Sequence, residues 1–170
     1  MDVIAKFYNM AGIQNYMNLF LYSAIAFVSF LGLAGGMFLA YSNRDELKPG
    51  RRYLVFAQKA IWALIIILTA LAYQLPLYAV IIILIFTVLP FFDRKQVHAP
   101  SMYLLQGIIF YLSAESVNLL AANASLIFLF GLPSGTLIKA DENGKIRKGF
   151  VKGLAKNLGF FVCMPLFFFI

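Results

Sequence analysis

The sequence has little of the equipment on which catalytic and metal sites depend. Its 170 residues include one cysteine (Cys163), one histidine (His98) and only 7 Asp and Glu. A single cysteine excludes an internal disulfide, and one cysteine with one imidazole leaves too few ligands for an ordinary zinc site. There is also no HExxH motif and no glycine-rich loop that ends in Lys-Ser or Lys-Thr. We therefore expect no metal, no cofactor and no catalytic centre.

Charge is scarce throughout the chain. Only 12% of the residues are charged and 62% are hydrophobic. In a soluble domain about 25% of the residues are charged and roughly 45–50% are apolar. The charges gather near 44–59, 93–98 and 139–156, with long apolar runs between them. This pattern is typical of an all-α, polytopic helical membrane protein. We predict an interfacial lead-in over 1–16 and a single transmembrane bundle over 17–170.

The apolar runs predict about six transmembrane helices. The first three are 17–41, 53–73 and 77–92, with a turn expected at Pro49-Gly50 between the first two. As one helix, 101–139 would be about 58 Å long, roughly twice the hydrocarbon core, so it is expected to cross twice. The last segment, 158–170, is short for a crossing. Five spans with a re-entrant or partial C-terminal segment is therefore the alternative.

The basic residues predict the orientation. They lie mainly in the loops after the first, third and fifth spans, so 42–52, 93–98 and 139–156 are expected to be cytoplasmic and the N-terminus outside. This role accounts for the net charge of +7, so we expect no nucleic acid; the expected partners are the lipid bilayer and other membrane subunits or a second copy. The residues assigned to lipid headgroups or topology are Arg44, Lys48, Arg51, Arg52, Lys145, Arg147 and Lys148.

Two stretches of the chain match each other. "GLAGGMFLAYSNRDELKPG" (32–50) and "GLPSGTLIKADENGKIRKG" (131–149) align without gaps at an offset of 99. The match suggests a parallel internal repeat, with units near 18–73 and 118–170; the alternative is a chance match between two sequences of similar membrane composition. Small residues at this spacing let helices approach closely. The predicted packing residues are Gly32, Gly35, Gly36, Gly131, Ser134 and Gly135.

Ser134 lies in L-P-S-G, which superficially resembles the G-x-S-G of rhomboid intramembrane proteases. A nucleophilic serine needs a general base within reach of its hydroxyl. The only imidazole is His98 in a charged loop, and the aligned partner of Ser134 is Gly35. We therefore predict a packing role for Ser134 and no catalytic role.

Glu115 is the most informative polar residue. The turn between the fourth and fifth spans is expected somewhere in "SAESVNLLAANAS". If it lies at 121–125, Glu115 is intramembrane and could form a cation or proton pathway with Ser116 and Asn118. If it lies at 113–118, Glu115 caps a helix at the outer surface. The sequence leaves both alternatives open.

Two functions fit these features. The first is a structural, assembly or accessory subunit of a membrane complex, and the alternative is a small oligomeric transporter or channel with a site around Glu115 and Asn118. A transporter should have water-accessible polar groups at mid-depth. An accessory subunit should have a dry core and an exposed face of small residues.

Overall fold

The computed structural model describes residues 19–42, 47–88, 100–141, 153–155 and 157–162. These residues form helices and short turns, and the described part of the chain contains no strand. The all-α prediction is confirmed. The helices are α2 Leu19–Ser42, α3 Leu47–Ala72, α4 Leu77–Val88, α5 Pro100–Ser113, α6 Val117–Asp141 and α8 Gly159–Val162.

Three of these helices are long and apolar enough to cross a membrane. The qualifying segments are Phe20–Ser42, Pro49–Ala72 and Val117–Ile138, and 22 to 24 residues correspond to about 33–36 Å of helix. The apolar segment Met102–Ser113 of α5 is shorter. The helices are thus consistent with a membrane location, and the total of six spans stays a prediction.

The start of α3 differs from the prediction. The second span was expected to begin at Tyr53, after a turn at Pro49-Gly50, but α3 begins at Leu47 and includes both residues. The prediction of a turn was wrong because proline in the first turn of a helix costs little. Its missing N–H is one that the first turn leaves without an intrahelical partner.

The chain reverses between α5 and α6 at 114–116. Three successive amides donate to carbonyls three residues back, namely Ala114 to Tyr111, Glu115 to Leu112 and Ser116 to Ser113. Residues 121–125 lie inside α6, so the alternative that placed the turn there is wrong. Stretch 101–139 therefore folds back on itself, with Glu115 in the connection.

The α3–α4 turn has a left-handed residue at its centre. Gln74 has φ 52°, and the Leu75 amide donates to the Ala70 carbonyl at 2.9 Å. This is the arrangement in which a helix ends on one left-handed residue, a position that glycine usually occupies. It reverses the chain so that α4 runs back along α3.

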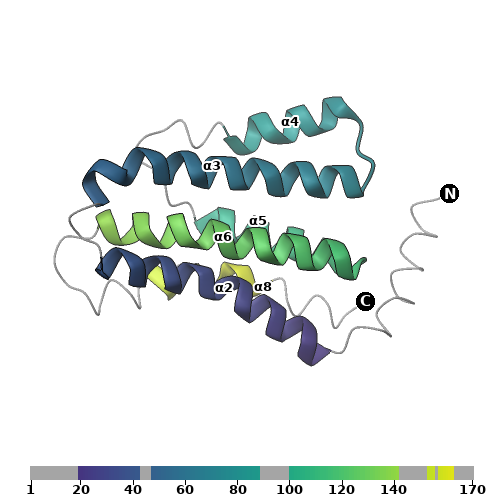
Figure 1. Cartoon of the computed structure of the whole chain (residues 1–170). Helices are drawn as coiled ribbons and strands as arrows, with labels where there is room; N and C mark the ends of the chain where they lie inside the picture. The colour runs from purple at the N-terminus through teal and green to yellow at the C-terminus, as the bar shows by residue number, and fades with distance from the viewer. Residues whose placement is uncertain (1–18, 43–46, 89–99, 142–152, 156, 163–170) are drawn as a thin grey trace.

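α6 lies at the centre of the bundle. It packs against α2, α3 and α5; α4 packs on the outer side of α3, and α8 packs against α5 (Figure 1). Aromatic rings fill much of the interior. The largest fully buried ones belong to Tyr22, Trp62, Phe110, Phe130 and Phe160.

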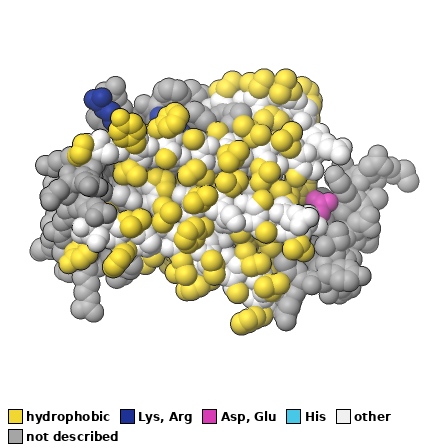
Figure 2. All heavy atoms as spheres, viewed as in Figure 1, with side chains coloured by type: hydrophobic (Ala, Val, Ile, Leu, Met, Phe, Trp, Pro, Cys, Tyr) yellow, Lys and Arg dark blue, Asp and Glu magenta, His cyan; other side chains and the backbone are white. Residues whose placement is uncertain are grey.

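Helix ends that flank two of the charged loops lie together. α2 and α6 end, and α3 begins, at the left end of the bundle in Figure 1, whereas α4 ends and α5 begins nearer the middle of its length. The α3–α4 turn lies at the opposite end. Figure 2 shows that the charged side chains on this face also lie toward the two ends, with hydrophobic side chains over the middle. Such an apolar belt fits a bilayer.

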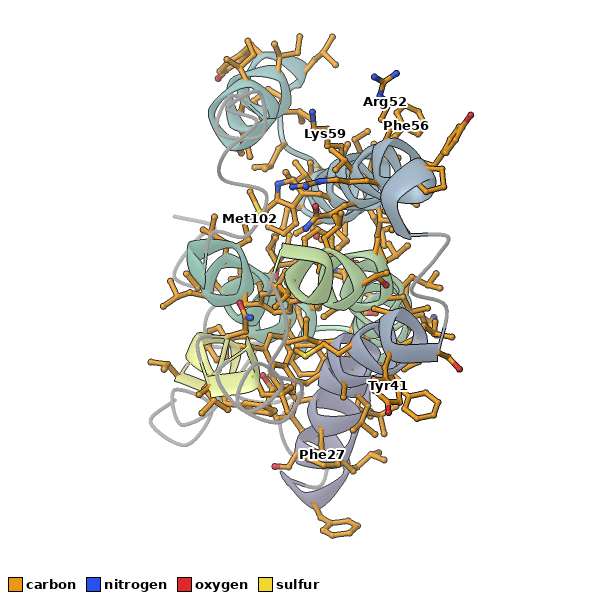
Figure 3. All side chains as sticks on the ribbon, turned by 90° about the vertical axis from the view of Figure 1, so that its left-hand side faces the viewer. Phe27, Tyr41, Arg52, Phe56, Lys59 and Met102 are labelled. Carbon is orange, nitrogen blue, oxygen red and sulfur yellow. The ribbon has the colours of Figure 1, made fainter. Side chains whose placement is uncertain are left out.

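Large apolar side chains also point away from the bundle. Phe27 and Tyr41 on α2 and Phe56 on α3 extend outward (Figure 3), and each is at least half exposed. Exposed aromatic and aliphatic side chains on this scale are unfavourable in water and ordinary in lipid.

Candidate functional site

One face of α2 contains glycines that touch the backbone of α6. A Cβ added at Gly32 would overlap the carbonyl of Phe128, and one added at Gly36 would overlap the carbonyl of Leu132. The two helices therefore meet backbone to backbone, with no side chain between them at these points. This is the close approach that small residues allow between helices in membranes.

The glycines of α6 take part reciprocally. A Cβ at Gly131 would meet the backbone of Gly32, and one at Gly135 would meet the backbone of Gly36. A residue farther along α2 contacts a residue farther along α6, so the two helices are parallel. The separations, 131 − 32 and 135 − 36, are both 99, the same offset at which the two stretches align. Gly131 and Gly135 thus lie close to their aligned counterparts, although the atoms nearest to an added Cβ belong to Leu33.

The other two predicted packing residues lie elsewhere. A Cβ at Gly35 would meet only the Leu132 side chain, at 3.4 Å, which is an ordinary contact. Ser134 is buried and faces α3, where its Oγ accepts a hydrogen bond from Nε2 of Gln58 at 2.9 Å. The same hydroxyl donates to the Phe130 carbonyl at 2.8 Å. Its proton is thus committed to the helix backbone, and His98 lies outside the described residues.

The face of α6 that carries Ser134 lines a buried polar region. The Phe130 ring lies 5.8 Å from the Trp62 ring of α3 and 5.8 Å from the Tyr103 ring of α5, centroid to centroid. The Tyr103 hydroxyl lies beside Ser134 without forming a hydrogen bond of good geometry. We call this region the core polar layer. It comprises Gln58, Trp62, Tyr103 and Ser134, and we include Gln106 because it lies three residues after Tyr103, toward the same side of α5. All five side chains are buried.

The sequence analysis missed the two glutamines of this layer. Gln58 and Gln106 are amides inside long apolar runs, and polar side chains in such runs are expected to face other helices. That rule, applied to uncharged residues as well as to Glu115, would have singled them out. Their contacts across helices have no signal in a single sequence.

A second polar cluster lies nearer the α5–α6 turn. Nδ2 of Asn123 donates to Oγ1 of Thr69 at 3.1 Å and to Oγ of Ser113 at 2.6 Å. These two hydroxyls in turn donate to carbonyls of their own helices, at Ile65 and Ile109. One asparagine thereby joins α3, α5 and α6.

Glu115 lies beside Tyr73 at this end of the bundle. The Tyr73 hydroxyl donates to the Leu112 carbonyl at 2.7 Å. Burial raises the pKa of the Tyr73 phenol above its ordinary value of 10.0, and the neighbouring Glu115 carboxylate raises it further. Glu115 is half-buried, whereas Ser116 and Asn118 are exposed, so these three do not form an enclosed pocket among the described residues.

An apolar groove opens between α2 and α6. Toward its N-terminal end α2 diverges from α6 (Figure 1), leaving a groove of about 670 Å³. Small residues form much of its walls, including Ala24, Ala121 and Ser125. The hydroxyls of its two serines donate to carbonyls of their own helices, Ser29 to Ile25 and Ser125 to Ala121, each at 2.8 Å. The groove therefore presents no hydroxyl that requires a polar ligand.

The residues assigned to topology are only partly described. Arg51 and Arg52 are exposed near the start of α3. Lys48 lies in α3, but its side chain is not described. Arg44, Lys145, Arg147 and Lys148 lie outside the described residues.

Neither a metal site in the described residues nor a related protein indicates what the chain does. Within the described ranges, no three His, Cys, Asp or Glu side chains gather as a metal site would require. Comparison of the chain with protein-family models, with curated proteins and with solved structures finds no match.

Proposed function

We propose that the chain is a multi-pass integral membrane protein that serves as a structural, assembly or accessory subunit of a membrane complex. The observation that carries this proposal is the groove between α2 and α6. It is open at the surface and apolar, and five of its nine lining residues are alanine or serine. An exposed face of this kind suits a helix of a partner subunit.

The exposure of the groove residues supports a helical partner. Ala121 and Ser125 are both exposed and lie four residues apart on α6, the small-x-x-x-small spacing at which membrane helices approach closely. Elsewhere the exposed surface is rich in bulky side chains such as Phe20, Phe38 and Leu71. A trough of small residues in a bulky exterior favours protein contact over contact with lipid alone.

The polar groups favour the same proposal over a transporter. The core polar layer lies inside the bundle, and the described groove is lined by none of its members. The alternative placed a pathway at Glu115 and Asn118, but Asn118 is exposed and Glu115 belongs to the turn beside Tyr73. This position suits a residue at the end of the bundle.

The topology and the repeat belong to the proposal. We infer six spans, with the charged loops 42–52, 93–98 and 139–156 in the cytoplasm and the N-terminus outside. The ends of α2 and α6 and the start of α3, which lie together at one end of the bundle, support this orientation for loops 42–52 and 139–156 (Figure 1). The pairing of Gly32 with Gly131 and of Gly36 with Gly135 supports a parallel repeat, since copies related by an axis along the membrane normal bring equivalent residues together.

The test is purification of the full chain in mild detergent with a groove-filling variant. Ala121→Leu places a bulky side chain in the groove, and Ala60→Leu adds the same bulk at an exposed position of α3 outside it. We expect a stoichiometric membrane partner with the wild type and with Ala60→Leu, and its loss with Ala121→Leu. A pure homo-oligomer in every case would contradict the subunit role and favour the transporter.

A further inference from the structure

Gln106 is completely buried, and among the described residues its side chain has no hydrogen-bond partner. Its exposed fraction is 0%, and neither Oε1 nor Nε2 is bonded to any group within the described structure. A primary amide offers two N–H donors and a carbonyl acceptor. Burying all of them without partners costs much free energy, and more in a bundle surrounded by hydrocarbon than in one surrounded by water.

Other orphaned polar atoms lie in the same layer. Tyr103 is on α5 three residues before Gln106, which puts both side chains toward the same side of that helix. Its hydroxyl and the indole N–H of Trp62 are buried and likewise lack a partner in the described part of the chain. The two rings flank Phe130 at equal distance. Side chains from α3 and α5 thus bring unused donors and acceptors to one level of the bundle.

The chemistry of these atoms defines what could satisfy them. No member of the core polar layer carries a charge at neutral pH, so the layer does not call for an ion. It offers N–H donors from Gln106 and Trp62, an acceptor from Gln106, and a phenol that does either. Water has this dual capacity, and a buried water typically forms about three hydrogen bonds.

We propose that the core polar layer is an internal hydration site, in which ordered water bonds to the Gln106 amide and the Tyr103 hydroxyl. The site is enclosed, because both side chains are almost completely buried. The bound water links α5 to its neighbours through hydrogen bonds that the protein atoms alone do not make. This water departs from the dry core expected of an accessory subunit, but it is enclosed, whereas a transporter requires polar groups in contact with bulk water. The proposal does not require the groove to be occupied.

Replacing Gln106 by methionine gives results of opposite sign for a hydrated and a dry layer. Methionine is unbranched and close to glutamine in size, and it removes the amide. If water satisfies that amide, Gln106→Met loses hydrogen bonds and the Tm in lipid nanodiscs falls by a few degrees. If the layer is dry, the substitution removes unsatisfied groups and the Tm rises. Leu105→Met, at an exposed neighbouring position, should leave the Tm unchanged.

Hydroxyl-radical footprinting tests the same site without depending on a variant that folds. Radicals formed from bound water oxidise the side chains next to that water, so we expect oxidation of Tyr103 in the intact wild-type protein despite its burial. Labelling in H₂¹⁸O should then show slow exchange of that water. An unoxidised Tyr103 in the wild type, or a raised Tm in Gln106→Met, would overturn the proposal.

Discussion

α6 associates with its neighbours by different means on two of its faces. Toward α2 it presents Gly131 and Gly135, and the two backbones touch, with one added hydrogen bond from Thr136 Oγ1 to the Gly36 carbonyl at 3.2 Å. Toward α3 and α5 it presents Asn123, Phe130 and Ser134, which form hydrogen bonds and ring contacts. In a bilayer there is no hydrophobic gain from joining two apolar helices, so close packing and interhelical hydrogen bonds are the available sources of stability. This one helix uses both.

The difference has consequences for tolerance to substitution. At the glycine face the neighbour of each Cα is a backbone carbonyl or amide, which cannot rotate out of the way. At the polar face the neighbours are side chains, and the loss of one hydrogen bond leaves the ring packing in place. We therefore expect that substitutions on the glycine face abolish folding and that substitutions on the polar face lower the stability by smaller amounts.

The largest effect is expected at Gly36. Gly36→Ala places a methyl group against the Leu132 carbonyl, so α2 and α6 must separate, and we expect loss of most of the folded protein in size-exclusion chromatography in detergent. Gly35→Ala is the matched control, because its methyl would meet only a movable leucine side chain at 3.4 Å. Equal behaviour of the two variants would remove the distinction between the faces.

A smaller effect is expected at Ser134. Ser134→Ala removes the acceptor for Gln58, and interhelical hydrogen bonds of this kind contribute about 0.6–2 kcal/mol in membranes. A double-mutant cycle with Gln58→Met, read from thermal unfolding, should give a coupling energy in that range. Strictly additive effects would mean that the bond contributes nothing to stability.

A pH-dependent effect is expected at the end of the polar face. The raised pKa of Tyr73 means that the folded state favours the neutral phenol, so its stabilising contribution is complete below pH 10.0 and falls as the pH rises through the folded-state value. Glu115→Gln should lower the Tyr73 pKa but leave it above 10.0, because burial is the larger cause. The measurement is tyrosinate absorbance, with Tyr73→Phe subtracted. An unchanged pKa in Glu115→Gln would contradict the placement of the carboxylate.

The smallest effect is expected at Ser125. Its hydroxyl donates to the Ala121 carbonyl of its own helix, so it joins no two helices. Ser125→Ala should change the thermal stability by less than about 0.5 kcal/mol, as expected for a surface substitution away from such contacts. A loss as large as that of Ser134→Ala would show that the two serines are equivalent and that the division of α6 into faces is wrong.

The all-helical class can be predicted from the sequence, but the contacts between the helices cannot. The long apolar runs predict α2 within two residues at each end: the predicted span is 17–41, and the helix is Leu19–Ser42. Pro49 misled the prediction of the α3 start because a helix tolerates proline in its first turn. Asn123 and Ser125 made 121–125 look like a turn, yet one bonds to neighbouring helices and the other to its own. Whether a polar residue marks a turn or an interface depends on partners distant in sequence.

For the glycine motif, close packing could be predicted from the sequence, but the helix against which it packs could not. Its small residues predict close packing, and its offset of 99 predicts equivalent positions in two copies. That the two matching stretches pack against each other, rather than against other helices, depends on how the whole chain is arranged. For the same reason Gly35 could not be distinguished from Gly36 before the facing backbone was known.

The central claim is that α2 and α6 lie parallel and in register within one membrane bundle. It is tested most directly by distances between spin labels in nanodiscs, on a Cys163→Ser background. Phe20, Tyr41 and Val117 are exposed label sites, and the 21 residues between the first two correspond to about 32 Å of helix. We predict a clearly shorter distance for the 20–117 pair than for the 41–117 pair. The reverse order would mean that the helices are antiparallel and would contradict the account.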